Sequence, residues 1–309
     1  METINIEKLK KSDYRSRESY KNLRTNVILS GKENKVIMLT SCSPNEGKST
    51  ISFNLALSIA ESGKKVLFLD LDLRKSVLIG RYKIRKAIKG ITHYLSGQSE
   101  LQEVVYRTNC RGLDVIFSGP VPPNPAELLS GNAFKDMMEL VKVEYDYVIV
   151  DTPPLGNVID AAIVAQSCDA AVLVIAANSV SYKFAQNVLD QLKKTKIRII
   201  GTVLNKVDLS ENGYYGKYYG KYYGKYYGNY GKETSESSSE SGSSGTSPSG
   251  SSSGSLSRGS SSLESSSGSS SRSYSSRVVS PDIRQDSSAR PTVKTLRKNP
   301  PTSSGHKPV

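Results

Sequence analysis

Residues 36–63 read VIMLTSCSPNEGKSTISFNLALSIAESG, and this stretch decides the fold. It begins with the apolar run 36–40, which predicts a short buried strand. A polar loop follows, and after it a helical pattern over 49–62 that Gly63 closes. A strand, a polar loop with a glycine and a helix, in this order, are the parts of a phosphate-binding loop, so the sequence predicts a P-loop protein.

The loop matches the pattern GxxxxGK[ST] over residues 42–49, except that Cys42 replaces the first glycine. Gly47 lets backbone amides turn toward an anion, Lys48 brings a positive charge to the outer phosphates, and Ser49 offers a hydroxyl to Mg²⁺. The alternative is a polar turn that merely caps a helix. We expect bound ATP and Mg²⁺, with the nucleotide held by Ser43, Pro44, Asn45, Glu46, Gly47, Lys48, Ser49 and Thr50.

Further apolar runs predict more strands, and helical stretches lie between most of them. These runs span residues 66–70, 113–117, 147–151, 170–176 and 199–205. Strands that are apolar throughout and alternate with helices are typical of a parallel sheet covered on both faces. The sequence therefore predicts the α/β class, a P-loop NTPase with a doubly wound, mostly parallel sheet whose ligands lie beyond the carboxyl ends of the strands.

Carboxylates follow two of these strands. Asp70 and Asp72 stand in FLDLDLR (68–74), on one face if the chain stays extended, and Arg74 follows them. One carboxylate of such a pair can hold a metal-bound water while the other accepts a proton, and the arginine can neutralise phosphate oxygens. Asp151 ends the strand YVIVD, where a Walker B carboxylate would face Mg²⁺. A solvated strand end with an incidental ion pair is the alternative for the first pair.

Composition divides the chain into three parts. Residues 1–211 look foldable, 212–231 hold a tyrosine repeat, and 232–309 are dominated by Ser, Gly and Pro, which predicts a disordered tail with a basic end. The formal charge of +13 is spread along the chain, so it favours solubility rather than nucleic-acid binding. Three isolated cysteines, no long apolar run and no signal peptide indicate a cytoplasmic protein.

The tyrosine repeat reads YYGKYYGKYYGKYYGNY over residues 214–230 and contains nine of the 18 tyrosines. Its glycines favour a flexible strand that can present several hydroxyls in turn. We expect phosphorylation of Tyr214, Tyr215, Tyr218, Tyr219, Tyr222, Tyr223, Tyr226, Tyr227 and Tyr230. The alternative is a sticky aromatic tract that binds RNA or polysaccharide.

The motifs GKST, FLDLDLR, VIVDTPP (148–154) and PNPAELL (123–129), in this order, resemble the bacterial tyrosine kinase (BY-kinase) family. Within it the chain is most similar to the cytoplasmic kinases of Gram-positive capsule and exopolysaccharide systems. The resemblance covers about residues 1–230. It implies a fold related to the partitioning ATPases with a deviant Walker A motif, but the signature lysine of those ATPases falls at Ser43 here, which favours a kinase.

The resemblance implies a role for each motif residue. Lys48 would bind phosphates, Ser49 would bind Mg²⁺ and Asp70 and Asp151 its waters, and Asp72 would activate the tyrosine hydroxyl. The family also assembles rings through a helix with the pattern ExxRxxR, which here lies within 18–29 and reads Glu18, Lys21 and Arg24. Lysine at the second position loses the bidentate fork of arginine, and a plain charged surface helix is the alternative.

Partners follow from the same resemblance. It implies a membrane-spanning activator or chain-length regulator, a ring of identical chains, tyrosine-containing substrates, an opposing tyrosine phosphatase, and a place at the inner face of the plasma membrane through the activator. The basic end 290–309 suggests contact with lipid or an acidic partner.

Two other functions remain open from the sequence. A partitioning or scaffolding ATPase is disfavoured by Ser43 and by the tyrosine repeat. A GTPase is suggested by the NKVD sequence at 205–208 but disfavoured by TPP after Asp151, so Asn205 is interpreted as a neighbour of adenine.

Overall fold

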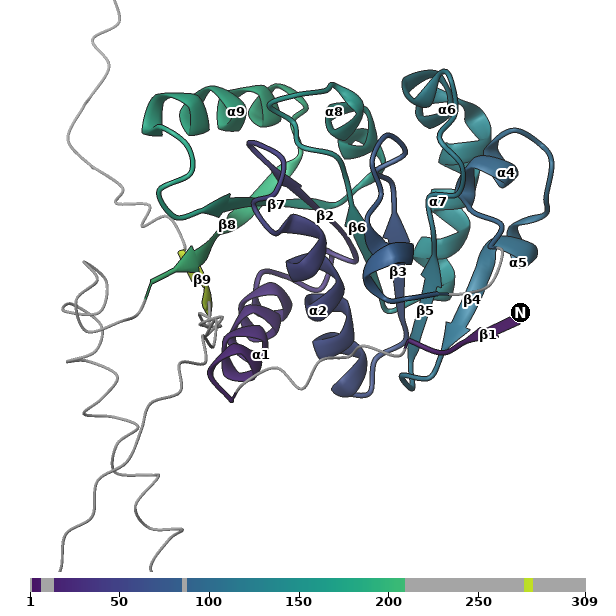
Figure 1. The fold of residues 1–309 in the computed structure, drawn as a ribbon, viewed down its shortest axis with the longest axis horizontal. Coiled ribbons are helices and arrows are strands. Elements are labelled where there is room, and N and C mark those ends of the chain that lie inside the picture. Colours follow the sequence, from purple (N-terminus) through teal and green to yellow (C-terminus); the bar gives the residue numbers. More distant parts are fainter. Residues whose placement is uncertain (1, 7–13, 85–87, 209–274, 280–309) are drawn as a thin grey trace, which may run out of the picture.

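A computed structural model describes residues 2–6, 14–84, 88–208 and 275–279 of the chain. The described strands form one twisted sheet at the centre of the molecule (Figure 1). Their spatial order is β1 (Glu2–Ile4), β4 (Val105–Thr108), β5 (Leu113–Ile116), β3 (Val66–Asp70), β6 (Tyr147–Asp151), β2 (Val36–Ser41), β7 (Ala170–Ala176), β8 (Arg198–Val207) and β9 (Ser275–Val279).

Neighbouring strands run parallel except at two places. β4 pairs antiparallel with β5, and β9 pairs antiparallel with β8. The core strands β3, β6, β2 and β7 are all parallel, as expected for strands that are apolar along their whole length. Their carboxyl ends therefore meet at one edge of the sheet, which is where the predicted site residues lie.

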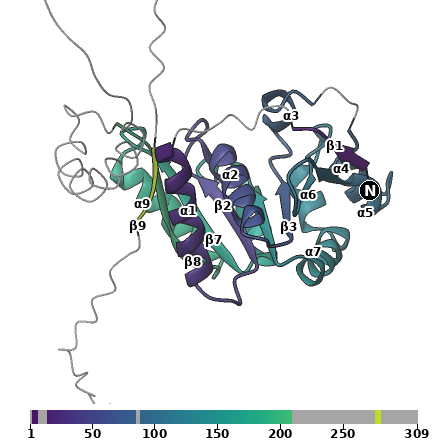
Figure 2. The ribbon, with the colours of Figure 1, turned by 90° about the horizontal axis from the view of Figure 1, so that it is seen from below.

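Helices cover both faces of the sheet (Figure 2). One apolar core joins the sheet to the first helices of the chain, because Leu23, Val27, Ile51 and Ile59 pack with Phe68. These helices are α1 (Tyr14–Leu29), α2 (Lys48–Glu61) and α3 (Leu78–Arg81).

The second core lies on the opposite face, where Phe134, Met137, Val164 and Leu192 pack with Leu69. It includes side chains of α4 (Ile91–Leu95), α5 (Leu101–Val104), α6 (Pro125–Ser130), α7 (Asn132–Glu144), α8 (Asp160–Val164) and α9 (Tyr182–Lys194), and the 3₁₀ turn Ala165–Ser167 follows α8. A sheet with helices on both faces confirms the doubly wound fold predicted from the sequence.

The strands predicted from apolar runs are present, with bounds that differ by at most two residues. Three strands were not predicted. β1 is a short edge strand and β4 is a short strand beside it, both with few apolar residues, and β9 lies inside the Ser-rich tail. For residues 275–279 the expectation of disorder therefore differs from the structure, because the run RVV gives this segment a strand preference that the serine composition hides.

The helices of the described part of the chain do not include one that is long and apolar enough to span a bilayer. The tyrosine repeat and most of the tail lie outside the described residues.

Candidate active site

The P-loop connects β2 to α2, and its backbone needs two unusual conformations. Asn45 has φ 65° and Gly47 has φ 90°, both in the left-handed region. A Cβ atom on Gly47 would also lie 2.1 Å from the amide nitrogen of Asn205. Glycine is therefore required at position 47 for its conformation and for lack of space.

Cys42 replaces the first glycine of the motif without disturbing the loop. Its side chain is fully buried in the core below the sheet edge. Burial, together with the nearby Glu46, raises the pKa of the Cys42 thiol to about 12. Cys42 therefore acts as a small apolar side chain, and its thiol stays protonated near neutral pH.

Glu46 holds the P-loop in place from inside. Its buried carboxylate accepts hydrogen bonds from Ser43 N at 2.7 Å, from Ala176 N at 3.3 Å and from Ser179 Oγ at 3.1 Å. The first bond closes the loop on itself, and the other two join it to the end of β7. The Glu46 side chain therefore points into the protein and braces the loop, and a contact of this residue with the nucleotide stays a prediction.

The end of β8 supports the same loop from another side. The Asn205 side-chain amide donates to Glu46 O at 2.8 Å, and Lys206 Nζ donates to Asn45 O at 2.6 Å. Asn205 thus lies against the P-loop, where a neighbour of the nucleotide is expected. Whether it contacts adenine stays a prediction.

Lys48 is buried and forms an ion pair with Asp151. Its ammonium lies 2.7 Å from Asp151 Oδ1, and the same oxygen accepts from the Ser52 hydroxyl at 2.9 Å. Lys48 Nζ also lies 3.3 Å from Ser49 Oγ. The P-loop lysine, the hydroxyl expected to bind Mg²⁺ and the Walker B carboxylate are therefore in one cluster.

Asp70 lies next to Asp151, because these two residues are register partners on the parallel strands β3 and β6. Asp70 accepts from Ser76 Oγ at 2.5 Å and from Asp72 N at 3.3 Å. Burial, and then the negative charge of Asp151, raise the pKa of Asp70 to about 7, although the Ser76 hydroxyl and Lys48 oppose the shift. Two buried carboxylates side by side repel each other, and a bound cation would relieve this repulsion.

The second oxygen of Asp151 supports a cation at the same place. Asp151 Oδ2 is buried and has no hydrogen-bond partner among the residues that the structure describes. Buried carboxylate oxygens without a donor are costly unless a ligand satisfies them. The hard oxygen donors of Asp70, Asp151 and Ser49 suit Mg²⁺, which prefers few protein ligands and retains water. The residues present therefore fit the expected metal.

Asp72 and Arg74 differ from each other in their surroundings. Asp72 is half-buried, and its carboxylate accepts from Lys75 N at 3.0 Å. Arg74 was expected to face phosphate, but its guanidinium forms a bidentate pair with the buried Asp160, at 2.7 and 2.9 Å. In this structure Arg74 joins the loop after β3 to α8, and its contact with phosphate stays a prediction.

The remaining predicted residues fall into three groups. The Thr50 hydroxyl accepts a hydrogen bond from Arg81, on α3. On α1, Lys21 forms an exposed ion pair with Glu18 at 2.8 Å, and Arg24 donates to Ser58 O of α2 at 2.8 Å. The nine tyrosines of the repeat lie outside the described residues.

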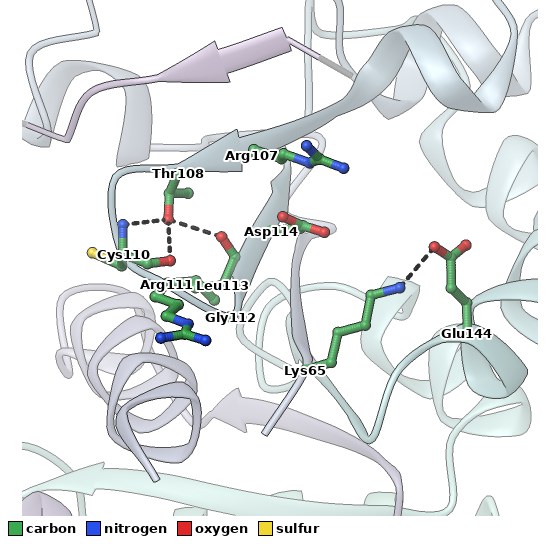
Figure 3. A pocket seen from close by; sticks show the side chains of 9 residues that line it. All are labelled: Lys65, Arg107, Thr108, Cys110, Arg111, Gly112, Leu113, Asp114 and Glu144. Carbon is green, nitrogen blue, oxygen red and sulfur yellow. Dashed lines mark hydrogen bonds and ion pairs between the residues drawn. The ribbon is translucent and has the colours of Figure 1, made fainter. Parts of the chain in front are cut away.

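A cavity of about 350 Å³ lies at the opposite edge of the sheet, away from these residues. Figure 3 shows the side chains that line it. Leu113, on its wall, begins β5, and Lys65 precedes β3, so the cavity lies at the amino ends of the strands. Its lining consists of Lys65, Arg107, Thr108, Cys110, Arg111, Gly112, Leu113, Asp114 and Glu144. None of them belongs to the predicted site.

Comparison with known proteins agrees with this geometry. Residues 34–206 match the family described as AAA domain. The chain is 45% identical over 215 residues to "Tyrosine-protein kinase CpsD" of Streptococcus pneumoniae serotype 4, a match that covers 69% of this chain and 95% of the relative. It is 39% identical over 204 residues to "Tyrosine-protein kinase YwqD" of Bacillus subtilis, over 64% of this chain and 86% of the relative.

A solved structure is also similar to this chain in fold and sequence. The kinase domain of the Escherichia coli tyrosine kinase ETK superposes with a TM-score of 0.58 at 36% identity, and the match covers 61% of this chain and 74% of that one.

Proposed function

The chain belongs to the bacterial tyrosine-protein kinases with an AAA domain, and from this membership we propose that it transfers the γ-phosphate of ATP to tyrosines, including those of its own repeat at 214–230. It is thus a protein-tyrosine kinase built on a P-loop. The observation that carries the proposal is the cluster of Lys48, Asp70 and Asp151 at the carboxyl edge of the sheet, with Asp72 two residues beyond β3.

Each residue of the cluster has a part in this proposal. Lys48 exchanges Asp151 for the outer phosphates of ATP, because an anion at the P-loop offers it a stronger partner. Ser49, Asp70 and Asp151 would hold Mg²⁺, directly or through water. When bound, this ion supplies positive charge to the phosphate oxygens.

Asp72 is the proposed base, since it is more accessible than Asp70 and lies close to the same edge. The tyrosine oxygen forms a bond to the γ-phosphorus while the bond from phosphorus to the bridging oxygen breaks. ADP leaves, and the proton of the tyrosine hydroxyl passes to the Asp72 carboxylate. General-base assistance of this kind typically contributes 10²- to 10⁴-fold to the rate.

Partners and location are part of the proposal. We expect a membrane-spanning activator to hold the kinase at the inner face of the plasma membrane, a ring of identical chains in which repeats are phosphorylated between subunits, and a phosphatase that reverses the reaction. Regulation of capsule or exopolysaccharide synthesis is the proposed cellular role. Added phosphates would repel one another and favour ring dissociation.

The test is incubation of the full chain with Mg-ATP or Mg-GTP, with and without a cytoplasmic peptide of the activator, followed by phosphate mapping. Phosphotyrosine within 214–230 is expected with ATP only. The Asp72→Asn variant should lose about 10²-fold or more in rate, whereas Asp136→Asn, an exposed aspartate on α7, should retain full activity. ATP hydrolysis without phosphotyrosine under every condition would contradict the proposal.

A further inference from the structure

The tail of the chain returns to the folded domain as the strand β9. Its partner, β8, is the last strand on that side of the parallel sheet. An exposed outer edge of such a strand presents unpaired N–H and C=O groups that pair readily with another chain. Here Val279 lies opposite Thr202, Val278 opposite Val203, and Arg277 opposite Leu204.

The pairing continues to the catalytic edge, where its register shifts. Ser275 lies opposite Val207, and the shift falls between Leu204 and Val207. The two residues in this interval are Asn205 and Lys206, whose side chains hold the P-loop backbone. Lys206 also has φ 56°. Because the pairing is irregular here, Asn205 and Lys206 can hydrogen-bond to the P-loop backbone, while the strand on either side of them pairs with β9.

Because β9 runs antiparallel to β8, the segment between the two strands begins and ends at the same end of β8. Both Val207 and Ser275 lie at the P-loop end of β8, and 67 residues, 208–274, connect them. These residues include the whole tyrosine repeat. Tyr214 follows Val207 by seven residues, so it lies within about 25 Å of it at full extension.

β9 also lies beside α1, the helix that carries Glu18, Lys21 and Arg24 (Figures 1 and 2). A strand at this position covers the edge of β8 next to the surface proposed for contact between subunits. β9 therefore lies beside both the strand that supports the P-loop and the helix proposed for subunit contact.

We propose that residues 275–279 are a docking strand, which occupies the edge of β8 and anchors the segment that contains the tyrosine repeat at both of its ends, Val207 and Ser275, at the P-loop end of β8. Docking itself is independent of catalysis. Only its consequence, that each subunit presents its substrate tyrosines to a neighbouring subunit on a segment tethered at both ends, rests on the proposed function. The sequence RVV within a serine-rich tail provides the strand preference that docking needs.

A pair of cysteines in register tests the docking in the full chain without nucleotide. Thr202→Cys with Val279→Cys places two thiols on residues that face each other in the ladder. The matched control is Thr202→Cys with Ser275→Cys, because Ser275 lies opposite Val207, roughly 16 Å further along the strand and beyond the reach of a disulfide. Under mild oxidation the first pair should form an intrachain disulfide at least tenfold faster than the control.

Three results would overturn the proposal: equal rates for the two pairs, no disulfide in either, or disulfides only between chains, which would show a second copy on the edge.

Hydrogen exchange gives an independent measurement. Val278→Pro should speed exchange of those β8 amides at 202–204 that point toward β9 about tenfold, because proline disrupts strand pairing. The control Ser252→Pro should leave them unchanged, and equal exchange in both variants would also overturn docking. Docking without any phosphotyrosine would contradict the proposed function alone.

Discussion

Glu46 shows how one side chain can determine the shape of a phosphate site without touching phosphate. Its carboxylate is the acceptor for two backbone amides and one hydroxyl, on the P-loop and at the end of β7. A carboxylate can accept at both oxygens, whereas an amide would present a donor to one of these groups. The P-loop shape therefore depends on charge and on hydrogen-bond polarity at this position.

The Glu46→Gln variant tests this brace. We expect it to lower the free energy of unfolding by about 1–3 kcal/mol, because a buried donor is left facing another donor. The KM for ATP should rise roughly tenfold, since the loop amides lose their fixed orientation. Chemical denaturation and initial rates provide the two measurements. Glu61→Gln, the same change at an exposed residue of α2, is the control, and equal behaviour of both variants would contradict the brace.

Asp70 makes the stability of the ligand-free protein depend on pH. The pKa of its carboxyl is raised to about 7 in the folded state, from an ordinary value near 3.8. The folded protein therefore binds a proton more tightly than the unfolded chain. Between about pH 4 and pH 7 the folded state is progressively disfavoured as pH rises, because only it must ionise a buried carboxyl next to Asp151.

The Asp70→Asn variant should lose this dependence. Between pH 4 and pH 8, the free energy of unfolding of the unaltered protein should fall by roughly 2–4 kcal/mol more than that of the variant, at about 1.4 kcal/mol per pKa unit. Urea unfolding at several pH values without Mg²⁺ measures the difference. Asp136→Asn should follow the unaltered protein. Parallel curves for Asp70→Asn and the unaltered chain would refute the role of Asp70.

At the scale of elements, the strands that carry the site follow from their sequence. The runs that form β3, β6 and β7 are apolar throughout, and each ends where it was predicted to end. Asp70 and Asp151 could be placed at one edge of the sheet for this reason. A parallel arrangement brings carboxyl ends together regardless of the intervening sequence.

The strand β4 and several side-chain contacts of the site had no apolar pattern that could predict them. β4 has the sequence VYRT and pairs antiparallel at the margin of the sheet, so neither its length nor its polarity distinguishes it from a loop. The contacts of Ser52, Ser76 and Asp160 were missed because they join residues far apart in the chain or lie inside a helix or turn. Single hydrogen bonds of this kind leave no periodic signal in a sequence.

The pair of Arg74 and Asp160 links two elements that both border the site, the loop after β3 and the helix α8. Asp160 is fully buried, whereas the Arg74 side chain is 43% exposed. Loss of the arginine would leave a buried carboxylate without its partner.

We expect Arg74→Gln to lower the free energy of unfolding by about 1–2 kcal/mol, less than for a fully buried pair because solvent screens the guanidinium. The double variant Arg74→Gln with Asp160→Asn should recover most of this loss. Thermal unfolding and phosphotyrosine formation are measured together. If stability recovers and the kinase rate does not, Arg74 also acts on phosphate. If the double variant is no more stable than the single one, the pair does not account for the effect.

At the scale of the whole molecule, α1 connects the proposed subunit contact to the active site. Arg24 donates to the carbonyl of Ser58 on α2, and α2 begins at Lys48 of the P-loop. Arg24 therefore has a role within the subunit, so its substitution would mix folding and assembly. Lys21 differs, because its partner Glu18 lies on the same exposed helix face.

Lys21→Ala should thus separate assembly from folding. An exposed ion pair between neighbouring turns contributes little to stability, so the melting temperature should change by less than about 2 °C. If the helix assembles rings, self-association measured by sedimentation with the activator peptide should weaken about tenfold, and phosphorylation between subunits should decline with it. Lys193→Ala is the matched control, since Lys193 forms an exposed pair of the same spacing with Asp190 on α9. Identical sedimentation of the two variants would exclude Lys21 from the subunit contact.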